Sequence, residues 1–287
     1  MAEKVYFSRV ITPDRALELY RRVGRNLEGR VAIKVHSGEK GNQNFLRPEF
    51  WEKIVREVGG TVVETNTAYR GARQFTADHL ALLAEHGWTE RFAVRILDEK
   101  GDRILPIPDG KVIQQNYVGE AIGEFDSLLV LSHFKGHPMG GFGGALKQLS
   151  IGMASSFGKQ YIHGAGDPKL FWDAEHDSFL ESMADAALSV VRFFEGRAVY
   201  LNVMKNMSVD CDCCAKAEDP CMKDIGILAS LDPVAIDRAC LDLVYAGDDP
   251  GKDHLIERIE SRNGVHTVDA AAALGVGSTE YELVCID

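Results

Sequence analysis

The stretch that most constrains the fold of this chain runs from residue 127 to residue 159. It opens with an apolar run at residues 127–131, which predicts a buried strand. Five glycines then fall within nine residues, and a helix is expected to begin near Ala145. In α/β proteins, a strand, a glycine-rich loop and a helix start form an anion site at the carboxyl end of the sheet. The stretch therefore predicts an α/β protein with a binding loop at its centre.

The side chains of this stretch suggest chemistry at the loop. His133 and His137 flank Lys135, and imidazoles bind metals or move protons while an ammonium holds an anion. We expect these three residues to be catalytic. A second expected group contacts a cofactor or small anion through backbone amides and one ammonium: Gly140, Gly141, Gly143, Gly144 and Lys159. The alternative is a connecting turn with surface histidines. The spacing matches neither a P-loop nor GxGxxG, which disfavours a nucleotide.

The rest of the chain alternates apolar runs with amphipathic segments. This order predicts a largely parallel or mixed sheet flanked by helices, in a single α/β domain over residues 1–287. Residues 1–125 and 126–287 are candidate interlocked lobes. A polar excursion at residues 98–110 is typical of a hairpin, and the helix after the glycines is expected to reach about Met153. The clearest predicted strands beside the central one cover residues 31–35, 61–65, 92–97, 199–203 and 225–230.

Charge and composition exclude several classes of protein. The formal net charge is −11, which argues against a general nucleic-acid binder but allows a local basic site for a small acid. The first ten residues lack the apolar core and cleavage site of a secretory signal. No apolar run approaches the length of a membrane span. We therefore expect a cytoplasmic protein with no membrane partner; its oligomeric state does not follow from the sequence.

Four of the six cysteines crowd into eleven residues and form a second chemical signal. In a reducing compartment such a cluster indicates a metal or redox site rather than disulfides. Thiolates bind iron–sulfur clusters or Zn²⁺, although this spacing is neither that of a ferredoxin nor that of a zinc ribbon. Cys240 is the best distant fourth ligand, but a small buried core residue is the favoured interpretation there. The expected metal ligands are Cys211, one or both of the adjacent Cys213 and Cys214, and Cys221.

Several motifs together resemble one known family. They are SHFKGH, GFGGALKQL, the Gly158-Lys159 pair, CDC followed by DIGILASLDPVAIDRAC, and the early VAIKVHSGE and LRPEF. In combination they are similar to the domain of unknown function 362 family, over nearly the whole chain. The resemblance implies an α/β fold and a redox-associated role, since members are often labelled iron–sulfur proteins. It implies no established reaction.

The chain also departs from this family pattern. Relatives commonly read KNLGMGCASR where this chain reads KQLSIGMASS, so Met153 stands at a usual cysteine and Ser156 at a usual arginine. Cys221 stands where relatives tend to have an apolar residue. If the usual cysteine is a cluster ligand, Cys214 or Cys221 is the candidate to replace it.

Three functions are consistent with these features. The first is a redox enzyme or electron-transfer component, with an iron–sulfur cluster, of the 4Fe-4S type, on the cysteine loop, a small anionic substrate or cofactor at the glycine-rich loop, and an electron-transfer partner. The second is a mononuclear enzyme in which His36 or His163 joins His133 and His137 around Zn²⁺, Ni²⁺ or Fe²⁺. The third is a non-catalytic module with structural Zn²⁺. A shared site requires residues 133–144 and 211–221 to meet.

Overall fold

The structure is a computed structural model that describes residues 2–287. Its centre is an eight-stranded sheet in the order β12-β1-β11-β10-β7-β2-β3-β4. Every strand of this sheet except β11 runs in the same direction. The strands are β1 (Glu3–Ser8), β2 (Val31–Lys34), β3 (Thr61–Glu64), β4 (Val94–Ile96), β7 (Ser127–His133), β10 (Ala198–Met204), β11 (Gly226–Ser230) and β12 (Tyr281–Cys285).

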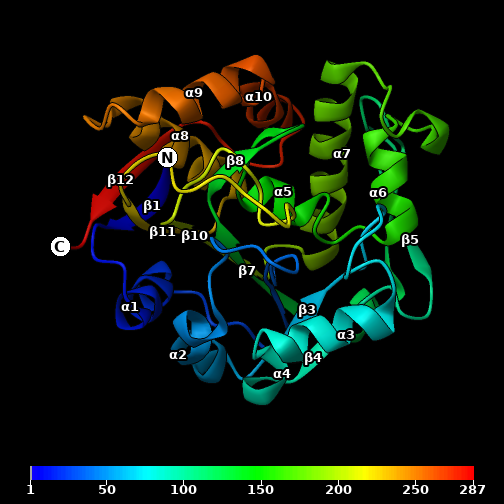
Figure 1. Ribbon diagram of the computed structural model, residues 1–287, viewed down its shortest axis with the longest axis horizontal. Coiled ribbons are helices and arrows are strands. Elements are labelled where there is room, and N and C mark those ends of the chain that lie inside the picture. The colour runs from blue at the N-terminus through cyan, green and yellow to red at the C-terminus, as the bar shows by residue number, and fades with distance from the viewer. Residues whose placement is uncertain (1) are drawn as a thin grey trace.

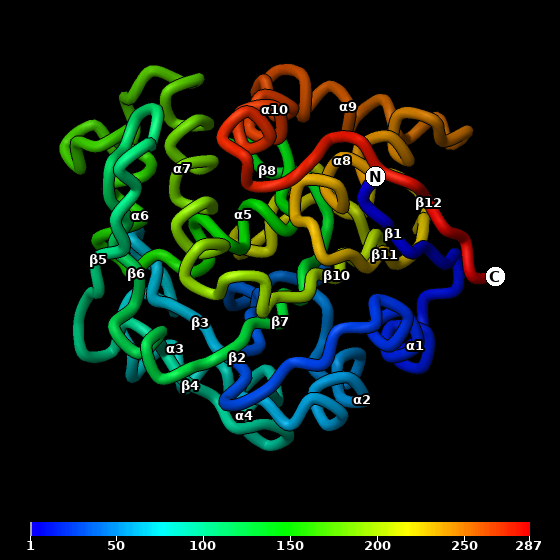
Figure 2. The backbone as a smooth tube through the Cα atoms, turned by 180° about the vertical axis from the view of Figure 1, so that it is seen from behind, coloured from blue at the N-terminus to red at the C-terminus, as the bar shows by residue number. Residues whose placement is uncertain are grey.

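Helices cover both faces of this sheet, as Figures 1 and 2 show. One face packs against α1 (Pro13–Val23), α2 (Pro48–Val58), α3 (Thr76–Glu85) and α4 (Trp88–Arg91). The other packs against α5 (Ala145–Leu149), α7 (His176–Phe194), α8 (Pro233–Ala246) and α10 (Val265–Ala273). The remaining helices are α6 (Ser156–His163), α9 (Lys252–Ser261), η1 (Glu120–Glu124) and η2 (Pro168–Leu170). The predicted α/β fold class is confirmed.

The order of strands creates a switch point between β2 and β7. The chain moves outward from β2 to β3 and β4, then returns to place β7 on the other side of β2 and β10 beside β7. The register pairs Lys34 with Val130 and Val203 with His133, so these strands end on one edge of the sheet. Open α/β sheets bind ligands in the crevice beyond the carboxyl ends at such a point.

Both ends of the chain contribute to the same side of the sheet. β1 pairs with β11 and with β12, although almost the whole chain separates β1 from β12. Figure 2 shows these two strands side by side at the edge of the molecule. The polar excursion forms a hairpin, β5 (Asp102–Pro106) with β6 (Gln115–Gly119), as expected. No helix within residues 2–287 is both long and apolar enough to span a bilayer.

The segment after the central strand differs from the prediction in two ways. The glycine-rich loop is itself a small hairpin, β8 (Lys135–His137) with β9 (Gly141–Gly143). The helix that follows ends at Leu149 instead of near Met153, and α6 begins at Ser156. The Ser155 side chain caps α6 by accepting the Gly158 N–H, an N-cap that the sequence analysis overlooked. The break matters because α6 carries Lys159 to the site.

Candidate functional site

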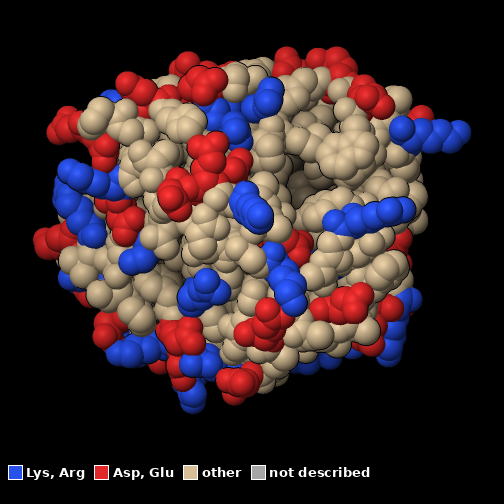
Figure 3. Space-filling view, in the orientation of Figure 1, with Lys and Arg blue, Asp and Glu red and all other residues tan. Residues whose placement is uncertain are grey.

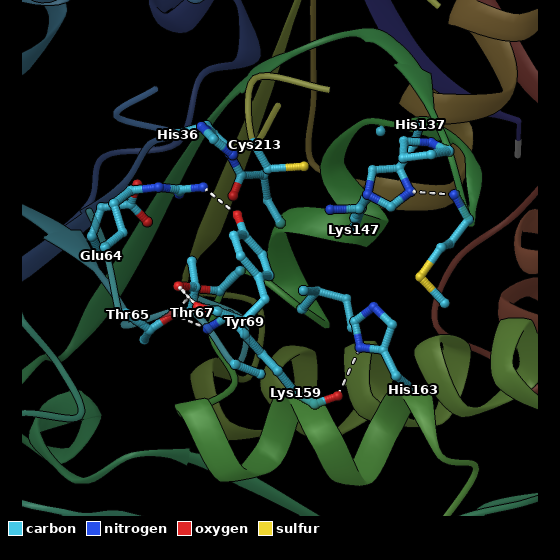
Figure 4. Close-up of a pocket in the computed structure, with 18 of the residues that line it drawn as sticks. His36, Glu64, Thr65, Thr67, Tyr69, His137, Lys147, Lys159, His163 and Cys213 are labelled. Carbon is cyan, nitrogen blue, oxygen red and sulfur yellow. Dashed lines mark hydrogen bonds between the residues drawn. The ribbon is translucent and has the colours of Figure 1, made fainter. Parts of the chain in front are cut away.

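A cavity of about 240 Å³ lies beyond the carboxyl ends of β2, β3 and β7. Its walls come from the segments that follow these strands, from the cysteine loop after β10, and from α5 and α6. The opening is visible as a hollow in the space-filling view (Figure 3), and Figure 4 shows the side chains around it. The site therefore lies at the switch point of the sheet.

The cavity is cationic although the protein is acidic. One carboxylate, that of Glu64, faces five basic side chains in the lining: Lys34, Arg73, Lys135, Lys147 and Lys159. The three lining histidines, His36, His137 and His163, all have a lowered pKa because burial disfavours the imidazolium, with values of about 4, 3 and 4. They are neutral at pH 7, so the lining carries a net positive charge that suits a small anion.

Lys34 and Glu64 form a buried ion pair in the wall of this cavity. Their Nζ and Oε2 atoms are 2.6 Å apart, and Glu64 also accepts the Ser37 amide and hydroxyl, both at 2.8 Å. Burial alone would raise the pKa of Glu64, but Lys34 and His36 outweigh it and hold that pKa well below the usual range. The carboxylate is thus fully satisfied by protein donors and anchors the end of β2 to the end of β3.

Arg73 approaches the cavity from the loop after β3. Its Nε atom lies 3.2 Å from Glu39 Oε2, and its Nη2 donates to the Tyr69 hydroxyl at 2.7 Å. Burial raises the pKa of Tyr69, so the phenol stays protonated. Neither residue was among the expected site residues, although a run of guanidinium and hydroxyl donors just past a predicted strand end is a signal that the sequence contains.

Two lysines on neighbouring helices complete the cationic wall. Lys147 on α5 is half-buried, and its side-chain amine has no hydrogen-bond or ion-pair partner among residues 2–287. Lys159 on α6 donates to Thr65 Oγ1 and to the Ala154 carbonyl, both at 2.6 Å. Burial, reinforced by the nearby cations Lys34 and Arg73, lowers the pKa of Lys159 to about 7.

A thiol and imidazole cluster borders the cavity on its other side. One ligand atom each from His137, Cys211 and Cys213 lies within 4.8 Å of the others. His137 Nδ1 accepts the amides of Met139 and Gly140, so its other ring nitrogen is the one left to interact with the Cys211 thiol. This cluster can hold a metal ion, because thiolate sulfur and imidazole nitrogen suit zinc and other borderline or soft metals.

Further donors surround the Cys211 sulfur. The Cys213 amide lies 3.4 Å from it, and the His36 ring, whose Nδ1 accepts the Gly38 amide, is close by. The thiols of Cys213 and Cys214 lie close together, and the interaction with Cys213 lowers the pKa of the Cys214 thiol. Three of the four clustered cysteines, Cys211, Cys213 and Cys214, therefore lie near one another in space. Cys211 is buried and Cys214 is half-buried.

Asp212 links the cysteine loop to the central strand. Its carboxylate lies 3.0 Å from His133 Nδ1 and 3.2 Å from Lys135 Nζ. The opposite ring nitrogen of His133 lies 2.5 Å from the Lys205 carbonyl, which can only accept, so that nitrogen carries a proton. Both imidazole nitrogens are thus engaged by protein. Sequence analysis missed Asp212; its place between two cysteines was the available signal.

A close backbone approach brings the two loops together. The Gly136 amide donates to the Ser208 carbonyl at 2.8 Å, and a Cβ on Gly136 would collide with the backbone of Val209. Glycine is required here because no other residue leaves room for the cysteine loop. The segments 133–144 and 211–221, far apart in the sequence, therefore do meet beside one cavity.

The structure separates the expected site residues into three groups. Lys135, His137, Gly143, Gly144, Lys159 and Cys213 line the cavity. His133, Gly140, Gly141, Cys211 and Cys214 lie behind this lining, in contact with it. Cys221 lies apart: its thiol donates to the Met207 carbonyl at 3.3 Å.

Two further residues named by the sequence analysis lie in the core. Cys240 is fully buried on α8, where its sulfur accepts from Asn202. Met153, where the family resemblance led us to expect a cysteine, is also fully buried and packs in the hydrophobic core.

Fold and site together define an α/β protein with a His/Cys cluster able to hold a metal beside a cationic cavity. A family model described as a domain of unknown function (DUF362) matches residues 31–242. Because this match covers most of the chain, the protein belongs to that family. A comparison with curated proteins found no match.

Two solved structures match this chain at 12% sequence identity. One is a protein from Thermotoga maritima, with a TM-score of 0.45 over 91% of this chain and 59% of that one. The other is the lactate racemase apoprotein from Thermoanaerobacterium thermosaccharolyticum, with a TM-score of 0.46 over 98% of this chain and 82% of that one. The present chain thus spans 59% of the length of the Thermotoga protein.

Proposed function

We propose that this protein is a metal-dependent enzyme that acts on a small anionic molecule in the cationic cavity. The observation that carries the proposal is the position of the His137, Cys211 and Cys213 cluster on the wall of a cavity whose lining has five basic groups and one carboxylate. A structural metal site is normally enclosed by four protein ligands, whereas a catalytic one keeps a position for substrate. A three-ligand set next to an anion cavity supports a catalytic role.

The donor atoms fit such a metal. Two thiols and one imidazole are the set that binds Zn²⁺ with an open fourth position. Metal binding displaces the protons of the two thiols, and the two amides that donate to His137 Nδ1 keep that ring oriented. A bound metal would supply a Lewis acid or, in an iron centre, an electron. The neighbouring cations would hold and orient the anion.

An iron–sulfur cluster is the second candidate, and one observation favours it. The thiol of Cys214 lies close to that of Cys213, which adds a third thiol beside the two in the cluster. Three cysteines with nearby N–H donors can ligate a cluster, since hydrogen bonds to sulfur tune its potential. In this version the protein is an oxidoreductase or electron carrier, and Cys221 would need a rearranged loop to become the fourth ligand.

Metal and acid-labile sulfide, measured on protein purified anaerobically, test the proposal. We expect metal in the wild type and its loss in Cys211→Ser and Cys213→Ser, with retention in Cys285→Ser, whose thiol is exposed on β12. Metal without sulfide that is also lost in His137→Ala identifies the mononuclear site. Iron with sulfide that is lost in Cys214→Ser identifies the cluster.

The proposal has a clear contrary result. Wild-type protein that holds no metal under these conditions contradicts it, and so does metal that survives in both Cys211→Ser and Cys213→Ser. Retention of tight zinc with no anion binding at the cavity would instead support the non-catalytic module.

A further inference from the structure

Lys159 is held in the cavity wall in an unusual chemical state for a lysine. It lies in the first turns of α6, and its side chain extends toward Thr65 at the end of β3, as Figure 4 shows. The residue is only 7% exposed, and the exposed part faces the cavity. Within residues 2–287 no carboxylate lies within ion-pair distance of its Nζ atom. A buried lysine without a counter-ion needs another explanation.

Hydrogen-bond accounting shows which form of the amine fits. The two acceptors at Nζ are Thr65 Oγ1 and the Ala154 carbonyl, each at 2.6 Å. A neutral amine has two N–H groups and one lone pair, so these acceptors satisfy both N–H groups and leave the lone pair free. An ammonium would carry a third N–H with no partner, next to the cations Lys34 and Arg73. The surroundings therefore favour the nucleophilic form.

We propose that Lys159 is a nucleophile that forms an imine with the carbonyl group of a small oxo acid whose carboxylate is bound by the other cations of the cavity. The inference rests on the anion cavity of the proposed function and names the class of substrate. It does not depend on the metal. Lys147 is the cation best placed to receive the carboxylate, because it lines the same cavity and has no partner within residues 2–287.

The step balances without any added oxidant or reductant. The Nζ lone pair attacks the carbonyl carbon, the C=O π electrons move to oxygen, and one proton passes from nitrogen to oxygen to give a neutral carbinolamine. A second proton then adds to the hydroxyl oxygen, the C–O bond breaks as the nitrogen lone pair forms the C=N bond, and water leaves. Loss of the remaining N–H proton gives the neutral imine, so two protons pass from nitrogen to oxygen in all.

His163 is the neutral base nearest in the chain for these proton transfers. Its Nδ1 donates to the Lys159 carbonyl at 2.7 Å, which leaves the Nε2 lone pair free in the neutral ring. Figure 4 shows that ring nitrogen turned away from α6, toward the side of the cavity where Lys147 and His137 lie. Burial lowers the pKa of His163 to about 4, so the ring is neutral at pH 7 and its Nε2 atom is unprotonated.

Reductive trapping tests the inference. The purified wild-type chain is incubated separately with pyruvate, glyoxylate and 2-oxoglutarate, each with sodium cyanoborohydride, and analysed by intact mass and peptide mapping. We expect one reduced adduct per chain with at least one of these acids, located on Lys159, and suppression of the adduct by excess sulfate. Lys159→Arg keeps a basic group but cannot form an imine, so it should lose the adduct. Lys53→Arg, at an exposed lysine, should keep it.

The outcomes separate this inference from the proposed function. No adduct with any of the three acids, or adducts confined to other amines, overturns the role of Lys159 whatever the metal content. Should Lys159→Arg fail to fold, the peptide map of the wild type still decides. Cys211→Ser should lose the metal yet still be trapped at Lys159. Trapping without metal in the wild type would contradict the metal site and leave the imine chemistry standing.

Discussion

Lys34 and Lys159 are both buried beside the same cavity, but they differ in what faces the nitrogen. Lys34 has the Glu64 carboxylate at 2.6 Å, whereas Lys159 has a hydroxyl and a carbonyl. A carboxylate stabilises an ammonium, while neutral acceptors do so weakly. The same residue type therefore serves as a structural cation in one wall and as a reactive amine in the other.

Trapping at Lys159 should depend on pH in a defined direction. Its pKa is lowered to about 7, so the free amine predominates above that pH and disappears below it. The initial rate of adduct formation should rise through about pH 7 and level off above pH 8, and the reverse trend or a flat profile would contradict a neutral nucleophile. The charged and titratable groups that face this amine are Asp98, Lys34, Glu64, Arg73 and the His163 ring.

Removing the charge of Glu64 should destabilise the fold strongly. Glu64→Gln leaves the Lys34 ammonium buried without its counter-ion, which typically costs about 3–5 kcal/mol. The measurement is the free energy of unfolding in urea. Glu85→Gln is a matched control, because Glu85 also pairs with a lysine, Lys40, but at the surface, where a pair contributes less than about 1 kcal/mol. Equal effects of the two substitutions would contradict the buried pair.

The short helix α5 depends on another element for its start. It has five residues, and the amides of Ala145 and Leu146 donate to the Asp237 carboxylate on α8, at 2.7 and 2.9 Å. Asn202 on β10 donates to the same carboxylate at 2.7 Å, and a Cβ on Gly144 would collide with that carboxylate. Asp237 thus joins the sheet and α8 to the segment that carries Lys147.

Asp237→Ala should therefore destabilise this element and weaken the cavity. It leaves three buried N–H donors without an acceptor, and each such loss costs about 1–3 kcal/mol before relaxation. We expect a net loss of roughly 2–5 kcal/mol in urea unfolding. Arg238→Ala, one residue along α8 in a partly exposed pair with Asp242, should cost less than about 1 kcal/mol. A loss of similar size in both variants would mean that the cap contributes little.

At the scale of helices and strands, the sequence predicted which segments form the site. It predicted less well which contacts each side chain makes. Apolar runs ended by polar loops located the ends of β2, β3, β7 and β10, because strand alternation and turn residues are local signals. The engagement of His133 by Asp212 and Lys205 was out of reach, because it depends on a contact between residues 79 apart in the chain. The cap at the start of α5 was out of reach for a similar reason, because Asp237 lies on α8, about 90 residues further along the chain.

The charge of the whole molecule and the charge of the cavity have opposite signs. The chain has a net charge of −11, yet five basic side chains line one enclosed site at the switch point of the sheet. Bulk acidity therefore disfavours nucleic acid and other large polyanions, while the local field still attracts a small anion that can enter. A ligand must be both small enough to enter the cavity and negatively charged. The composition of the chain gives only the net charge, so it could not identify the ligand.

The positions of the three tryptophans allow anion binding in the cavity to be measured by fluorescence. Trp51 and Trp88 are buried in the core on the α1 and α2 face of the sheet, with 2% and 0% exposure. Trp172 lies in the cavity lining and is 65% exposed. An anion that occupies the cavity should therefore alter the emission of Trp172 and leave the other two unchanged.

We expect oxalate, a non-reactive dicarboxylate, to change the fluorescence of the wild type in a saturable way. Trp172→Phe should abolish the change while Trp51 and Trp88 provide a constant background. Lys147→Ala should weaken oxalate binding roughly tenfold, since a hydrogen bond to a charged group contributes about 1.5–3 kcal/mol. Lys53→Ala, remote from the lining, should leave binding unchanged. A fluorescence change that persists in Trp172→Phe, or an oxalate affinity that is the same in Lys147→Ala and in the wild type, would mean that the anion binds elsewhere on the molecule.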